Sequence, residues 1–93
     1  AVRRAVSMTA KGLRVPVATP EDLVVLKAIA GRPRDIVDIE GLLDANPKLD
    51  RDRARASTAL FAELLEAPEI LETLDRLLAA HAPGPRRRKS RQV

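Results

Sequence analysis

The chain has 93 residues, of which 45% are apolar, with one aromatic residue, Phe61, and no cysteine. A chain of this length forms one small domain with a thin core, and the lack of thiols excludes disulfides and thiolate metal sites and favours the cytoplasm. No charge-free stretch approaches the roughly 20 residues of a membrane helix, so we expect a soluble protein.

The net charge of +4 is unevenly distributed along the chain. Residues 1–14 hold four cations and residues 86–91 hold five, whereas all thirteen acids lie between these two segments. We therefore predict one small domain over residues 1–82, acidic after residue 14, and a basic, disordered tail over residues 83–93. The cations of this tail are candidates for weak, nonspecific contact with nucleic-acid phosphates: Arg86, Arg87, Arg88, Lys89 and Arg91.

Two short strands around Lys11 and Gly12 predict a β-hairpin over about residues 5–18. In the second run, apolar residues at positions 13, 15 and 17 alternate with Arg14 and Pro16, and a proline suits an edge strand. Because an isolated hairpin is marginal in water, we expect these strands to lean on further strands or on a helical layer.

The next segment predicts a helix over about residues 20–30, with Thr19 as N-cap, Pro20 at the first helical position and Gly31 past the end. Its apolar side chains point in every direction around the axis, which is typical of a helix that is buried on all sides. We expect that more protein than this chain is needed to cover it. Lys27 lies among these apolar residues, so it must either reach the surface or meet a carboxylate.

A second helix is predicted over about residues 34–44, and Asp35 falls inside its apolar arc. Two interpretations of Asp35 remain open. It is either an N-cap, with Asp38 at the third helical position, or an inward carboxylate bonded to Lys27 or Arg32.

Two amphipathic helices are predicted over about residues 51–66 and 68–81, the first behind the cap Asp50. In the first, Phe61, Leu64 and Leu65 share the apolar side, and in the second His81 ends the apolar stripe as a helix-end group rather than a ligand. The expected fold is therefore α+β and mostly helical, an N-terminal hairpin followed by four helices.

The sequence contains no complete catalytic set. His81 has no serine or acid at motif spacing, zinc ligands are lacking, and no glycine-rich phosphate loop occurs. Asp35 and Asp38 are three residues apart, but acids at that spacing are usually cap and surface groups, so no metal site is predicted. The remaining candidates lie across one helix–helix corner: Lys27, Arg32, Asp35 and Asp38.

These four residues carry a family resemblance. The segment "VPVATPEDLVVLKAIAGRPRDIVDIEGLL" resembles the C-terminal part of bacterial minimal nucleotidyltransferases of the DNA polymerase β superfamily, which include abortive-infection toxins of type IV toxin–antitoxin systems. The family pattern is a strand, a Ser/Thr-Pro-Glu-Asp-Leu helix start, and then spaced lysine, arginine and two aspartates. The similarity spans about residues 3–78, and the expected fold is then the remnant of a nucleotidyltransferase-type domain.

The resemblance implies transfer of a nucleoside monophosphate from a nucleoside triphosphate to an acceptor, with Mg²⁺ held by an Asp-x-Asp pair after a Gly-Ser turn. Those motifs belong to the family's N-terminal half and do not occur here; the one Asp-x-Asp, Asp50 and Asp52, falls outside the family position. In this interpretation Lys27 and Arg32 contact nucleotide phosphates or support the site, and the two aspartates orient them. No catalytic set and no cofactor are expected in this chain alone.

Two functions follow. The chain is either the C-terminal segment or a truncated relative of a nucleotidyltransferase, completed by the missing N-terminal half, or a noncatalytic interaction module that binds a second copy or an antitoxin-type partner. Nucleic-acid binding by the basic tail is a weaker third possibility.

Overall fold

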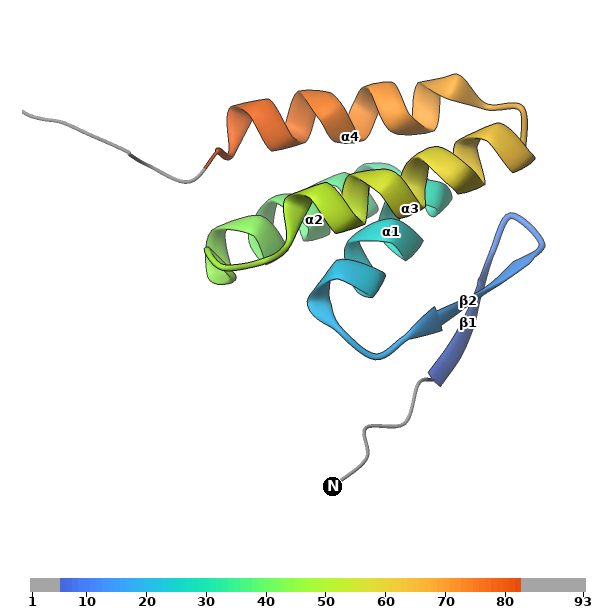
Figure 1. Ribbon diagram of the computed structural model, residues 1–93, viewed down its shortest axis with the longest axis horizontal. Coiled ribbons are helices and arrows are strands. Elements are labelled where there is room, and N and C mark those ends of the chain that lie inside the picture. The colour runs from blue at the N-terminus through green and yellow to red at the C-terminus, as the bar shows by residue number, and fades with distance from the viewer. Residues whose placement is uncertain (1–5, 83–93) are drawn as a thin grey trace, which may run out of the picture.

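The computed structural model describes residues 6–82, which form a two-stranded antiparallel hairpin followed by four helices (Figure 1). The elements are β1 (Val6–Ala10), β2 (Leu13–Val17), α1 (Pro20–Ala30), α2 (Pro33–Ala45), α3 (Arg51–Leu64) and α4 (Pro68–Ala80). This arrangement confirms the predicted α+β, mostly helical fold. The predicted basic tail, residues 83–93, lies outside the described residues.

Local signals determine where α1 begins and ends. Thr19 is the N-cap, and its side-chain oxygen accepts a hydrogen bond from the backbone N–H of Asp22 at 3.2 Å. Gly31 ends the helix in the left-handed region, with φ of 67°, where it donates its N–H to the carbonyl of Lys27. Only glycine adopts this conformation without a steric cost, which is why the helix ends here.

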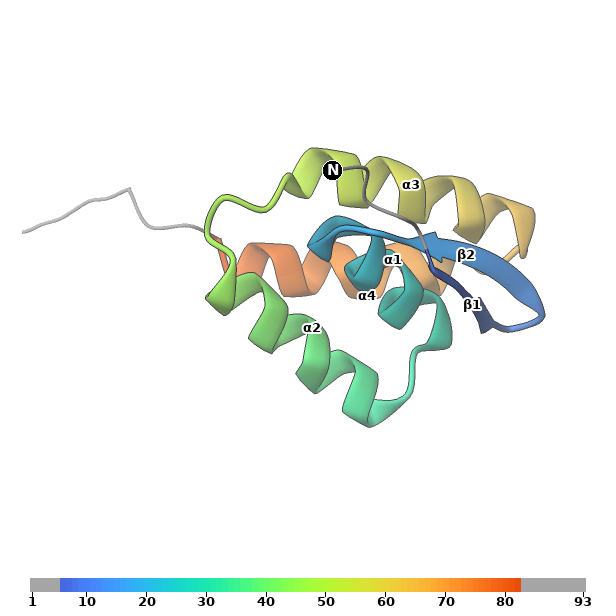
Figure 2. The same ribbon diagram turned by 90° about the horizontal axis from the view of Figure 1, so that it is seen from below.

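Helix α1 is the central element and contacts both strands and all three other helices (Figures 1 and 2). The hairpin lies over one side of it, and α2, α3 and α4 take the others. The residues of α1 that this arrangement buries are Val24, Val25, Leu26, Ala28 and Ile29. The expectation that further protein is needed to cover this helix is therefore wrong, because each neighbouring element shields one side of it; Leu23 and Ala30 remain partly exposed.

Only one face of the hairpin packs against α1. Met8 pairs with Val15 and Val6 with Val17, so these apolar side chains share a face. Val15 is buried, but Met8 is 45% and Val6 62% exposed, so β1 keeps uncovered apolar side chains on this face. In the described part of the chain β1 pairs only with β2, so its other edge is open.

Helices α3 and α4 lie antiparallel and side by side (Figure 1). Helix α3 ends two residues before the predicted position, because Glu66 adopts a φ of 53° and the chain turns ahead of Pro68. The buried face of α3 consists of Ala54, Thr58 and Ala62. The prediction that Leu64 is buried is wrong; it lies on the exposed side of the last turn.

Candidate functional site

The corner between α1 and α2 brings the four predicted residues together. Gly31 ends α1, Arg32 is the extended N-cap of α2, and Pro33 occupies its first turn. Lys27, in the last turn of α1, therefore faces the first turn of α2. We call Lys27, Arg32, Asp35 and Asp38 the corner cluster.

Asp35 is the centre of the corner cluster, and its side chain is 0% exposed. Its Oδ2 accepts hydrogen bonds from the backbone N–H of Arg32 at 3.1 Å and from Nε of Arg32 at 2.7 Å. Nη2 of Arg32 lies 3.4 Å from Oδ1. The side-chain hydrogen bond from Arg32 is the main reason that the pKa of Asp35 is lowered, against the opposing effect of burial.

The two interpretations of Asp35 can now be separated. The N-cap is Arg32 and not Asp35, because Pro33, with its fixed φ and missing N–H, suits the first helical position. Asp35 is the third helical residue and reaches back to the N-cap N–H, as the acid of a capping box does. It is also the inward carboxylate that bonds Arg32 and Lys27, so the second interpretation holds together with a local capping role.

Lys27 meets two carboxylates. Its Nζ lies 2.9 Å from Oδ2 of Asp38 and 3.5 Å from Oδ1 of Asp35, and its side chain is 25% exposed. The hydrogen bond to Asp38 is the largest cause of the raised pKa of Lys27, so the ammonium stays charged. Of its two partners, Asp38 is the accessible one, with 47% of its side chain exposed.

The corner cluster has no net charge, since two cations face two carboxylates. Asp35 and Asp38 are both engaged by cations, so their oxygens do not form the free donor set that Mg²⁺ needs. Within residues 6–82 no group of three or more histidine, cysteine or acidic side chains is arranged to hold a metal ion. An anion can reach Lys27 only by displacing its exposed partner, Asp38.

An open hollow of about 590 Å³ borders the cluster between α1 and α2. Lys27 and Asp38 line one part of it, and Leu23, Val37 and Leu42 give the rest an apolar lining. A ligand that places an anionic group on Lys27 can therefore lay an apolar body along α2.

Three further side chains form contacts that sequence patterns did not predict. His81 caps α4 and bonds Asp44 through Nδ1 at 3.0 Å and Glu40 through Nε2 at 3.1 Å, which raises its pKa. Arg53 of α3 pairs with Asp22 of α1 at 3.0 Å, and Arg55 pairs with Asp75 of α4 at 2.6 Å. The only available signal was the amphipathic pattern of each helix, which shows which face is polar but not which polar faces meet.

No family model matches the chain, and no curated protein and no solved structure matches it. None of the helices in residues 6–82 combines the length and the apolar character needed to span a bilayer. The tail candidates Arg86, Arg87, Arg88, Lys89 and Arg91 lie outside the described residues.

Proposed function

We propose that this chain is the C-terminal part of a nucleotidyltransferase and that its corner cluster contacts the phosphates of a nucleoside triphosphate. The observation that carries this proposal is the fully buried carboxylate of Asp35, which is shared by Arg32 and by Lys27, the cation that lines an open hollow. The acids that hold Mg²⁺ in the family would come from another segment, since those of the cluster are already paired. The corner then supplies binding and orientation, not a complete active site.

The energetics of the corner support a role beyond folding. A buried ion pair often stabilises a fold no more than apolar residues of similar volume, because desolvation offsets the attraction. Apolar residues could therefore hold α1 against α2 as well as these ion pairs do. A rigid pair of cations, held by a buried anion, is by contrast what recognition of a polyphosphate requires.

Lys27 and Arg32 have different parts in this proposal. Arg32 is held by Asp35 on one side, and 57% of its side chain is exposed on the other. Lys27 keeps one buried partner, Asp35, and one exposed partner, Asp38. A phosphate oxygen can take the place of Asp38 at Nζ without unpairing the buried carboxylate, so Asp38 competes with the ligand.

Titration of the ¹⁵N-labelled chain with ATP, with and without Mg²⁺, tests this proposal by amide chemical shifts. Removing one charge-assisted contact costs about 1.5–3 kcal/mol, so Lys27→Met and Arg32→Met should each weaken binding roughly 10- to 100-fold. Asp38→Asn should tighten it by removing the competitor. Lys48→Met, which removes an exposed lysine outside the cluster, is the matched control.

The proposal fails if ATP causes no shifts at the corner, or if Lys48→Met weakens binding as much as Lys27→Met. Independently of binding, the roughly 100 codons upstream in the gene should encode Gly-Ser and Asp-x-Asp in frame, since a half-domain is about that size.

The open edge of β1 favours a second candidate function, a noncatalytic module that pairs its hairpin with another copy. A free edge beside exposed Val6 and Met8 is a template for strand addition. Light scattering after size exclusion should then show a dimer that Met8→Lys dissociates and Val37→Lys, a charge placed on exposed α2, does not. A monomer at all concentrations would exclude this function.

A further inference from the structure

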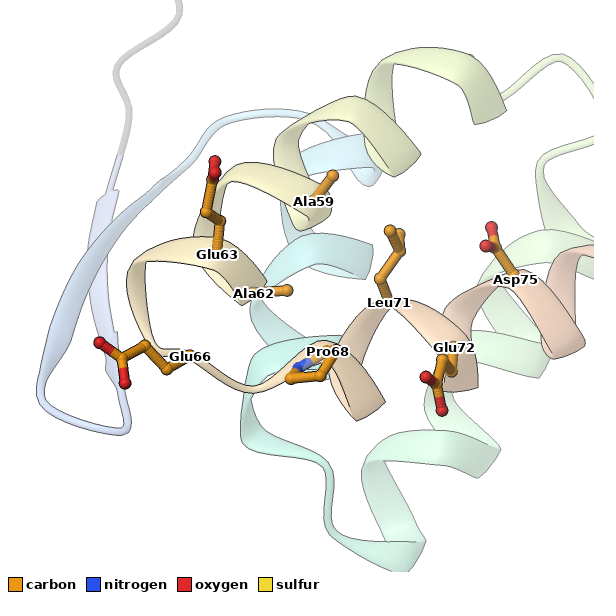
Figure 3. Close-up of a pocket in the computed structure, with 8 residues that line it drawn as sticks. All are labelled: Ala59, Ala62, Glu63, Glu66, Pro68, Leu71, Glu72 and Asp75. Atoms are coloured by element: carbon orange, nitrogen blue, oxygen red, sulfur yellow. The ribbon is translucent and has the colours of Figure 1, made fainter.

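Helices α3 and α4 flank a second open hollow, of about 510 Å³, close to the turn that joins them (Figure 3). Ala59 and Ala62 of α3 and Leu71 of α4 point toward the gap between the two helices. The alanine side chains are small, so they leave space between the helices. Because alanine and leucine are apolar, the floor of this space is apolar. We call it the α3–α4 groove.

Carboxylates surround this floor. Glu63 and Glu66 lie on the α3 side and Glu72 on the α4 side (Figure 3), and all three are exposed. None of them forms an ion pair with another residue of the described part of the chain. The fourth acid, Asp75, is already bound by Arg55 at 2.6 Å. The groove therefore presents three unpaired negative charges around an apolar strip.

Such a surface fits an arginine-rich peptide. The methylene stem of an arginine covers apolar surface while its guanidinium forms paired hydrogen bonds with a carboxylate at the edge. Residues 83–93 of this chain carry five cations and no acid, while residues 6–82 carry thirteen acids against ten lysines and arginines. The charges of the two segments are complementary.

We propose that the α3–α4 groove binds the arginine-rich segment of its own chain, residues 86–91. The path is short enough, since Glu72 lies about 15 Å along the helix axis from residue 82, at about 1.5 Å per residue. From residue 82, an extended chain reaches about 13 Å at Arg86 and about 30 Å at Arg91. The segment thus spans the groove from Glu72 to the α3–α4 turn, antiparallel to α4.

Occupation of the groove has a consequence for nucleic-acid binding. A guanidinium paired with a groove carboxylate is not available to a phosphate, so the docked segment competes with nonspecific binding. The groove shares no residue with the corner cluster, so this proposal and the proposed nucleotide site are tested at different residues.

The lack of cysteine allows a direct test in the full-length chain. Ser90→Cys introduces a single site for a nitroxide label within the basic segment, and the label broadens nearby amide signals. We expect the amides of Ala59 and Leu71 to lose most of their intensity at about 0.1 M salt and to recover it at about 1 M, where charges are screened beyond about 3 Å.

Matched variants separate docking from random contact. The double variant Glu63→Gln/Glu72→Gln should restore the two groove signals, whereas Asp52→Asn/Glu69→Gln, with one exposed acid removed from each of the same helices, should not. Equal effects of the two pairs, or no preferential broadening at the groove, overturn the proposal. Broadening that persists when the labelled copy is separate from the ¹⁵N-labelled copy places a second chain's tail in the groove and also overturns it.

Discussion

Removal of the buried carboxylate of Asp35 should destabilise the fold much more than removal of its exposed neighbour, Asp38. Asp35→Ala removes a helix-capping acceptor, worth about 1 kcal/mol, and charged hydrogen bonds, worth about 1.5–3 kcal/mol. Because the side chain of Arg32 is 57% exposed, water can hydrogen-bond the guanidinium that Asp35→Ala leaves unpaired, and this reduces the loss of stability. We expect a loss of about 3 kcal/mol in the free energy of unfolding.

Asp38→Ala breaks one exposed pair, and Lys27 keeps Asp35 as its partner. The expected loss is about 0.5 kcal/mol. In a domain of this size the two changes correspond to falls in Tm of roughly 12–24 °C and 2–4 °C. Urea unfolding followed by far-ultraviolet circular dichroism measures both variants against the parent chain.

The pH dependence of this effect follows from the lowered pKa of Asp35, whose ordinary value is 3.8. A carboxyl with a depressed folded pKa stabilises the fold fully above its unfolded pKa and loses that contribution as pH falls through the folded value. The difference between the parent chain and Asp35→Ala should therefore be constant above about pH 5 and shrink in stronger acid. Equal losses for Asp35→Ala and Asp38→Ala, or a difference that grows in acid, would refute the reasoning from burial.

Three further predictions concern other parts of the chain. The pKa of His81, ordinarily 6.5, is raised in the folded chain, so the stability it contributes is complete below pH 6.5 and is lost as pH rises through the folded pKa. Urea unfolding at stepped pH should show this fall in the free energy of unfolding, and His81→Gln should not show it. The buried hydroxyl of Thr58 has no hydrogen-bond partner among residues 6–82, so Thr58→Val should raise the free energy of unfolding by about 1 kcal/mol while Thr58→Ser lowers it. A loss with valine would contradict this. Gly31 has a φ of 67°, so Gly31→Ala should lower the free energy of unfolding by about 1 kcal/mol. Gly41 lies in mid-helix with open space at the Cβ position, so Gly41→Ala should raise it by up to about 1 kcal/mol. Thermal melts measure both, and a change of the same sign for both variants would be inconsistent with these backbone conformations.

The elements of the fold were predictable because short-range rules decide where they begin and end. Thr19, Pro20 and Gly31 mark both ends of α1 through their own backbone preferences, whatever surrounds them. Similarly, the two residues of the hairpin turn, Lys11 and Gly12, both have positive φ, as a tight two-residue hairpin turn requires.

The environment of α1 could not be predicted, because it depends on how five other elements are placed around one helix. An apolar residue such as Ile29 shows that something covers it, but not whether the cover belongs to the same chain. Contacts across long stretches of sequence were also missed, as with His81 and Glu40, 41 residues apart. In the corner cluster, by contrast, Arg32 and Asp35 are only three residues apart, so local spacing could predict that Asp35 bonds a neighbouring cation.

The position of α1 also bears on the proposed activity. A helix packed on all sides moves little, so Lys27 is held in place by the core, and its ammonium is oriented further by two carboxylates. Little side-chain freedom is then lost when a phosphate binds, which favours affinity. Since Lys27 retains some exposure while its neighbours Leu26 and Ala28 are buried, Lys27→Met should leave the fold intact and weaken binding. Stability and phosphate affinity are therefore separable at this residue, whereas at Asp35 they are expected to fail together.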